Sequence, residues 1–253
     1  YTVYFFFISL LLSGCSNEKA PVKNEIVIGI QADVQTINPM YAFSLIEGNL
    51  VDLLFMKPAN EIWNKTLGVI EFEPMLAKKW EWSEDSTSIK LYLRDDIYWS
   101  DGKPITAEDI AFTFDVYSDS KVNSRFFGLF GDFFLKDTNR INAEKTFNII
   151  SPKELAINFP ENASPDFLDI NLEIIPKHIW SQYSKEEFTS AEANFKPVTS
   201  GPFKLDKWEK EGFISLIRDS SSFLFDPDKL QKLVFKVIPD YKTRIIELKT
   251  GSI

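Results

Sequence analysis

The sequence contains very few of the residues on which catalytic and metal sites usually depend. Only one His and one Cys occur among its 253 residues. A hydroxyl nucleophile needs a neighbouring base, most often His, and His178 lies at the start of a short predicted helix, where we expect a structural role. The sequence also has no Gly-x-Ser-x-Gly motif, no glycine-rich phosphate loop and no metal-ligand spacing. It therefore predicts a protein that is not an enzyme, with no catalytic residue, no metal-binding residue and no cofactor.

The sequence also has fewer basic than acidic residues. The chain has 28 Lys and Arg against 37 Asp and Glu, a formal net charge of -9, and its basic residues form no stripe. Phosphate groups would be repelled by such a surface, so neither nucleic acid nor an anionic lipid surface is expected as a partner.

No apolar run is long enough to span a membrane, which takes roughly 20 residues. The apolar run at 3–10 is followed by Leu11, Leu12, Ser13, Gly14 and the single Cys15. This arrangement is typical of a bacterial lipoprotein signal, in which the thiol is acylated and the preceding residues are removed. Residues 1–21 are therefore predicted to be signal and tether, and no disulfide is expected. Since residue 1 is Tyr and no basic residue precedes the run, we expect the start to be clipped. The alternative is a buried helix or strand that contains a Cys by chance.

Hydrophobic residues make up 44% of the chain and include 23 Phe, enough to bury a core in one large or two modest domains. Apolar periodicity and turn residues predict interspersed strands and helices, which indicates an α/β architecture. The predicted strands are 25–30, 80–83, 88–93, 146–150, 154–159, 203–210, 212–218 and 233–237. The predicted helices are 45–55, 104–117 and 241–249, with short ones near Asp166 and Pro176.

The sequence also predicts four local features. The nearly continuous apolar strand 25–30 should be buried on both faces. In strand 88–93 one face should be buried, because Ile, Leu and Leu alternate with polar residues. Thr106 should cap the helix that follows it by accepting a hydrogen bond from a free backbone amide. Helix 241–249 should begin at Asp240, and Ile245, Ile246 and Leu248 should form its apolar side.

Five phenylalanines lie at spacings of three and four residues in the middle of the chain. Two interpretations stay open: they pack a core, which is the more common outcome, or some of them line a cleft for an organic ligand. They are Phe126, Phe127, Phe130, Phe133 and Phe134.

Three stretches in close succession have a more specific pattern. They combine a Trp-Glu segment, a Leu-Arg strand end and an Asp-Gly-Lys-Pro turn that leads into a Thr-Ala-Glu-Asp helix start, at 76–83, 91–94 and 99–110. In this order they resemble the family-5 solute-binding proteins of ABC importers, the oligopeptide, dipeptide and nickel type. Further segments fit the same order at 36–39, 175–180, 197–205, 237–240 and 247–251. Glycine in the turns at Asp101-Gly102 and Ser200-Gly201-Pro202 is expected to supply backbone angles that other residues resist.

The resemblance implies a fold and a division of the chain into domains. It implies the first lobe of an α/β periplasmic binding protein-like fold (class II, cluster C), a mixed sheet with helices, with the second lobe missing from this sequence. Domain I would be discontinuous, formed by 22–57 and 161–253, and domain II would be the insertion 58–160. Two such lobes close on a ligand by a hinge.

The resemblance also implies a function. The protein would be a monomeric lipoprotein, anchored to the membrane in the periplasm or at the cell surface, that delivers peptides or similar small solutes to ABC permease subunits. The family's first-lobe contact segment maps to Ala42, Phe43, Ser44 and Leu45, where a peptide would gain main-chain hydrogen bonds. A nickel-chelate, haem or oligosaccharide binder on the same scaffold is the alternative. From other classes, a periplasmic hydrolase would need an activated nucleophile, and a structural envelope lipoprotein would have no closable cleft.

Overall fold

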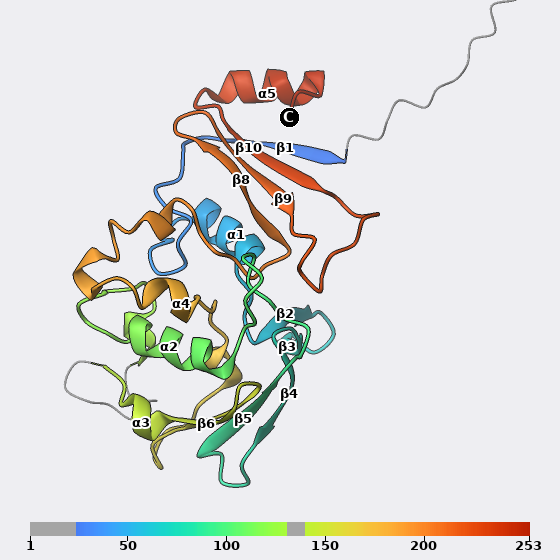
Figure 1. Ribbon diagram of the computed structural model, residues 1–253. Helices are drawn as coiled ribbons and strands as arrows, with labels where there is room; N and C mark the ends of the chain where they lie inside the picture. The colour runs from blue at the N-terminus through green and yellow to red at the C-terminus, as the bar shows by residue number, and fades with distance from the viewer. Residues whose placement is uncertain (1–23, 131–139) are drawn as a thin grey trace, which may run out of the picture.

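The computed structural model of the protein describes residues 24–130 and 140–253. Cys15 and the predicted tether lie outside these ranges, and so do Phe133 and Phe134. Figure 1 shows two larger sheets at opposite ends of the molecule, with helices and a small two-stranded ribbon between them. In the described ranges, no helix is long and apolar enough to cross a membrane.

The first sheet is mixed and joins the two ends of the described chain. Its strand order is β1-β10-β9-β8, with β1 parallel to β10 and the other pairs antiparallel. Helix α5 lies over one face and α1 lies on the other side, in contact with β8 (Figure 1). The strands are β1 (Glu25–Ile30), β8 (Phe203–Glu209), β9 (Phe213–Arg218) and β10 (Lys232–Val237), and the helices are α1 (Leu45–Leu54) and α5 (Tyr241–Thr250).

The second large sheet is antiparallel, with strand order β4-β5-β7-β6. Its strands are β4 (Ala77–Trp82), β5 (Ser88–Leu93), β6 (Phe147–Ser151) and β7 (Glu154–Asn158). On β5 the alternation of the sequence is reproduced in space, because Ile89, Leu91 and Leu93 are fully buried. The expected strands and the expected buried face of 88–93 are therefore confirmed.

The remaining elements connect the two sheets. The ribbon β2 (Ala59–Asn64) and β3 (Val69–Pro74) was not among the expected strands. Its residues do not alternate cleanly, and Trp63 and Ile70, which face each other across the ribbon, are both exposed. The other helices, including the short ones expected near Asp166 and Pro176, are α2 (Ala107–Tyr117), η1 (Phe127–Phe130), α3 (Ala143–Thr146), η2 (Phe167–Ile170), α4 (Lys177–Trp180), η3 (Lys185–Glu187) and η4 (Glu192–Asn194).

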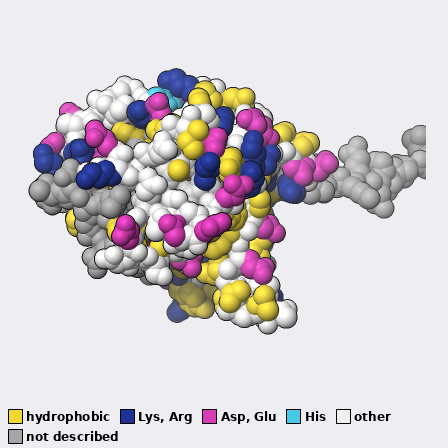
Figure 2. Space-filling view, turned by 90° about the horizontal axis from the view of Figure 1, so that it is seen from below, with side chains coloured by type: hydrophobic (Ala, Val, Ile, Leu, Met, Phe, Trp, Pro, Cys, Tyr) yellow, Lys and Arg dark blue, Asp and Glu magenta, His cyan; other side chains and the backbone are white. Residues whose placement is uncertain are grey.

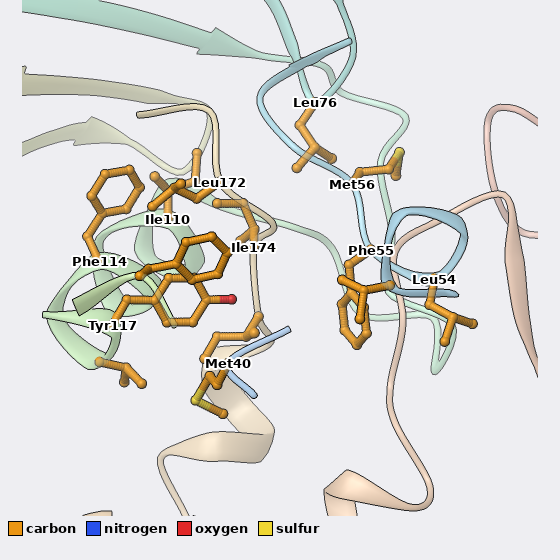
Figure 3. Close-up of a cluster of buried hydrophobic side chains, with 14 of the residues drawn as sticks. Met40, Leu54, Phe55, Met56, Leu76, Ile110, Phe114, Tyr117, Leu172 and Ile174 are labelled. Atoms are coloured by element: carbon orange, nitrogen blue, oxygen red, sulfur yellow. The ribbon is translucent and has the colours of Figure 1, made fainter. Parts of the chain in front are cut away.

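A continuous hydrophobic core runs between the helices and both sheets. Figure 3 shows part of it, where side chains of α2 face Leu172 and Ile174 of an extended segment and the residues after α1 pack nearby. Two of the five phenylalanines, Phe126 and Phe130, are buried here, whereas Phe127 is 40% exposed. The core interpretation is thus confirmed for these two residues, and Phe127 is left at the surface.

The burial expectation for the first strand was wrong, and the last helix is more exposed than most. Strand β1 lies at the edge of its sheet, and its residues Ile26 and Ile28 are 50% and 36% exposed, so the strand is not buried on both faces. Helix α5 does begin at Asp240, whose carboxylate accepts from the Thr243 N–H, but none of its residues is buried. An apolar run indicates that burial of its side chains is favourable. Whether one or both faces of the strand are covered depends on the whole fold.

The start of α2 differs in detail from the expectation. Thr106 does precede the helix, but its hydroxyl donates to the Asp109 carboxylate instead of accepting from an amide. The same carboxylate accepts from the Thr106 N–H at 2.8 Å. The helix end is therefore stabilised by Asp109, a residue placed to favour the positive end of the helix dipole.

The two glycine turns have different physical reasons. Gly102 has a φ of 84°, in the left-handed region that favours glycine, as expected. Gly201 does not have a positive φ; instead, a Cβ there would lie 2.3 Å from the Leu53 carbonyl oxygen. The N–H groups of Ser200 and Gly201 both donate to the Leu54 carbonyl at the end of α1, and this close approach leaves no room for a side chain.

We predict that Gly201→Ala lowers the free energy of unfolding by roughly 1–3 kcal/mol, because the new methyl group must displace the backbone of α1. Chemical denaturation followed by far-ultraviolet circular dichroism measures the change. Gly48→Ala in α1 is the matched control, since nothing lies within 4 Å of its added Cβ, and it should raise stability by about 0.5–1 kcal/mol. Equal effects of the two substitutions would show that the contact at Gly201 does not matter.

Candidate functional site

The loop before α1 is folded tightly onto itself. The Asn38 side chain accepts from the Met40 N–H at 2.9 Å and donates to Asn194, and the Asn38 carbonyl accepts from the Tyr41 N–H. Asn38 and Ile37 are both buried. The Asn-Pro turn is therefore a structural support, and it sets the direction of the residues that follow.

Those residues are the four expected to contact a ligand, here called the 42–45 segment. Ala42 is 1% exposed, so its side chain packs into the core. Phe43 and Leu45, in contrast, are 74% and 80% exposed. Ser44 is also exposed and has extended backbone angles, φ -90° and ψ 157°. The segment thus presents two large apolar side chains to the surroundings on an extended backbone.

The carboxylate of Glu47 holds the far end of the segment. Ser44 and Glu47 form a capping box at the start of α1, in which the Ser44 N–H donates to Glu47 Oε2 at 2.9 Å. The other oxygen, Oε1, accepts from the N–H groups of Gln35 and Thr36. Burial alone would raise the pKa of Glu47, but the hydrogen bonds from Ser44, Gln35 and Thr36 outweigh it and lower the pKa below its ordinary value.

Phe43 lies between two residues whose backbone groups are hydrogen-bonded, but its own backbone groups are free of hydrogen bonds to the described residues. The Ala42 carbonyl accepts from the Arg125 side chain and the Ser44 N–H is taken by Glu47. Within the part of the chain that the structure describes, neither the N–H nor the C=O of Phe43 has a hydrogen-bond partner. An exposed, extended residue with a free donor and a free acceptor is suited to pair with another extended chain.

A hollow of about 340 Å³ lies at the other end of α1. In it the Lys57 ammonium lies 3.3 Å from Glu61, 3.7 Å from Glu173 and 3.8 Å from Asp52. Burial lowers the pKa of Lys57, but these carboxylates outweigh that effect and raise it above its ordinary value. The charges are paired with one another, which makes this cluster a connection between α1, β2 and the segment around Glu173.

The single histidine lines another hollow and has a structural contact. His178 Nε2 lies 2.8 Å from Asp101 Oδ2, and its ring packs edge-on to Trp99. Among the described residues, no hydroxyl group bonds to the imidazole ring, and no group of three His, Cys, Asp or Glu side chains is placed to hold a metal ion. His178 therefore joins α4 to the Asp101 turn.

Neither Glu47 nor Arg125 was expected from the sequence to have a role at the site. For Glu47 a signal was present, because Ser44-x-x-Glu47 has the spacing of a capping box. For Arg125 no local signal exists, since its partners Pro39, Ala42 and Glu173 are far away in the sequence.

Comparison with known families gives a match over most of the chain. The profile of the bacterial extracellular solute-binding proteins, family 5 (middle), matches residues 71–253. The oligopeptide-binding protein AppA of Bacillus subtilis is 24% identical over 97% of this chain and 45% of its own length. The nickel-binding periplasmic protein of Escherichia coli is 28% identical over 71% of this chain and 32% of its own.

Solved structures agree on the fold. NikZ from Campylobacter jejuni, in complex with Ni(L-His), has a TM-score of 0.74 and 28% identity over 91% of this chain and 42% of that one. AppA from Bacillus subtilis, in complex with a nonapeptide, has a TM-score of 0.74 and 21% identity over 90% and 43%. The chain thus spans less than half the length of these proteins.

We predict that Glu47→Gln lowers the free energy of unfolding by about 1–3 kcal/mol at pH 7, because hydrogen bonds to a charged acceptor are replaced by weaker ones. The pKa of Glu47 is lower in the folded protein, so this contribution is complete above its ordinary value of 4.5 and is lost as the pH falls through the folded value. Denaturation curves of the parent and the variant between pH 7 and pH 3 should converge on the acid side.

Glu108→Gln is the control for that measurement, since Glu108 is an exposed first-turn residue of α2 that pairs with Lys177. Its effect should stay within about 0.5 kcal/mol. A Glu47 effect that is independent of pH would contradict the role of the ionised carboxylate.

Proposed function

Because the chain belongs to family 5 of the bacterial extracellular solute-binding proteins, we propose that it captures a peptide or a similar small solute for delivery to the permease subunits of an ABC importer. The observation that carries this proposal is the free backbone of Phe43, held between two fixed neighbours. The relatives in the comparison are solute-binding proteins, and this agrees with a role in binding instead of catalysis.

The 42–45 segment binds the solute by main-chain pairing. The N–H and C=O of Phe43 exchange hydrogen bonds with an extended peptide, as in the addition of a strand to a sheet edge. The exposed side chains of Phe43 and Leu45 cover apolar parts of the peptide. Main-chain contacts are the same for most side chains, so the site accepts many sequences.

The domain arrangement follows the same proposal. Domain I consists of 22–57 and 161–253, and domain II is the insertion 58–160. The mixed sheet draws its strands from the first set of residues and the antiparallel sheet from the second, which supports this division. The remaining ligand contacts come from the part of the family's length that this chain does not span.

A nickel-chelate, haem or oligosaccharide binder on the same scaffold is the second candidate. It is supported by the similarity to NikZ and to the nickel-binding periplasmic protein. A chelated metal would bring its own ligands. Binding it would therefore not require the backbone pairing with the 42–45 segment that an extended peptide uses.

Native mass spectrometry of the complete gene product carrying Cys15→Ser tests the proposal. We expect a ladder of bound peptides from the expression host, and micromolar or tighter binding to members of a pentapeptide library. A single copurified metal chelate would favour the second candidate. A protein whose melting temperature responds to no peptide, chelate, haem or sugar would overturn both.

We predict that Phe43→Ala weakens binding of the library pentapeptides about tenfold, because the bound peptide would no longer cover an aromatic side chain. Isothermal titration calorimetry with the tightest library member measures it. Trp63→Ala on the β2–β3 ribbon is the matched control, since Trp63 is also a large exposed aromatic residue, at 59%. Equal affinities of the parent and Phe43→Ala would place the peptide elsewhere.

The lipid anchor is a separate part of the proposal. When cells that produce the protein are grown with radioactive palmitate, the protein should become radioactive and should be found in the membrane fraction, because Cys15 carries the acyl chains. Cys15→Ser should abolish the label and release the protein, whereas Ser16→Ala should change neither. Label on the Cys15→Ser variant would show that Cys15 is not the anchor.

A further inference from the structure

A single arginine fixes the other end of the candidate site. The Arg125 side chain donates from Nε to the Pro39 carbonyl at 2.9 Å and from Nη1 to the Ala42 carbonyl at 3.3 Å. Its backbone N–H donates to the Met40 carbonyl at 2.8 Å. Three carbonyl groups of the loop leading into the 42–45 segment are thus held by one residue.

The guanidinium itself is held in place by buried groups. Its Nη2 lies 3.0 Å from Glu173 Oε1, and the Glu173 side chain is only 4% exposed. The guanidinium carbon lies 4.4 Å from the centre of the Phe126 ring. Glu173 is itself fixed, because its backbone carbonyl accepts from the Tyr117 hydroxyl at 2.8 Å. A planar fork with three nitrogens can make these contacts at once, and an ammonium group cannot.

This arrangement pairs the charge of Arg125 inside the protein and uses three of its five N–H groups. Its positive charge faces the Glu173 carboxylate, and each of its three side-chain nitrogens has an acceptor. The neighbouring exposed groups, Phe43 and Leu45, are apolar. Contacts available to a ligand at this place are therefore backbone hydrogen bonds and apolar surface.

We infer that Arg125 is a positioning residue, which with Glu173 holds the backbone of Phe43 ready for a ligand without contacting the ligand, and that the site takes an uncharged, apolar stretch of an extended peptide. The inference rests on the proposed function and specifies its substrate class. Arg125 and Glu47 hold the residues on the two sides of Phe43, whose own N–H and C=O have no partner among the described residues.

The test uses Arg125→Gln, and Arg125→Gln combined with Glu173→Gln, in the complete gene product carrying Cys15→Ser. The double variant removes the buried carboxylate that the single variant would leave without its arginine partner, so it keeps the test open if the single variant does not fold. Amide hydrogen exchange is measured by mass spectrometry on fragments covering 39–46 and 88–93. We expect exchange in 39–46 to become about tenfold faster while 88–93 stays unchanged, because a local contact is lost without global unfolding.

Arg218→Gln is the matched control. Arg218 also donates to two loop carbonyls, those of Leu230 and Leu224, and stacks over the Phe203 ring, but in the mixed sheet. It should leave exchange in 39–46 unchanged. Arg125→Lys should not restore slow exchange, since an ammonium group cannot span the three acceptors.

Binding is measured with two pentapeptides. One has Leu and Phe at its interior positions, and the other has Asp at the same positions. We expect the apolar peptide to bind the parent more tightly than the Asp peptide, and the double variant to bind it about tenfold more weakly. Unchanged exchange in 39–46, unchanged affinity, or a preference for the Asp peptide would each overturn the inference. If the parent binds neither peptide nor any library member, the proposed function fails, and the exchange data alone then decide whether Arg125 fixes the segment.

Discussion

A charge that is removed from water must be met by donors inside the protein, and the candidate site depends on two carboxylates under this constraint. Glu47 is 5% exposed and Glu173 is 3% exposed. Glu47 accepts hydrogen bonds from three backbone N–H groups on both sides of the loop. Glu173 binds Arg125, whose side chain donates to two carbonyls of the same loop. The Glu47 carboxylate and the arginine thus bond the backbone on both sides of Phe43, whose own N–H and C=O have no partner among the described residues.

Much of the fold follows from local sequence. The strand at 88–93 alternates Ile89, Leu91 and Leu93 with polar residues, and the sheet buries those three. Asp240 and Thr106 mark the starts of α5 and α2, because their short polar side chains suit a helix end. In these places local preference and tertiary packing agree, so the sequence alone is sufficient.

The remaining features depend on contacts between distant parts of the chain. Ile26 and Ile28 are as apolar as core residues, but their exposure depends on which elements cover the edge strand β1. Gly201 is required by the backbone of α1, which is about 150 residues earlier in the chain, and no turn rule describes that contact. At the site, the family resemblance indicates the 42–45 segment, whereas Arg125 and its partners Pro39 and Glu173 can be recognised only in three dimensions.

The free energy available at the segment indicates how it must work with the rest of a binding site. Covering the side chains of Phe43 and Leu45 contributes roughly 3–6 kcal/mol, taking about 1.5–3 kcal/mol for each. A micromolar complex needs about 8 kcal/mol after the cost of association, which is itself several kcal/mol. The segment alone therefore supports only weak capture. Because its backbone is already fixed by Glu47 and Arg125, little further ordering is needed when a second surface closes over the peptide, and most of the free energy of the added contacts remains available as affinity.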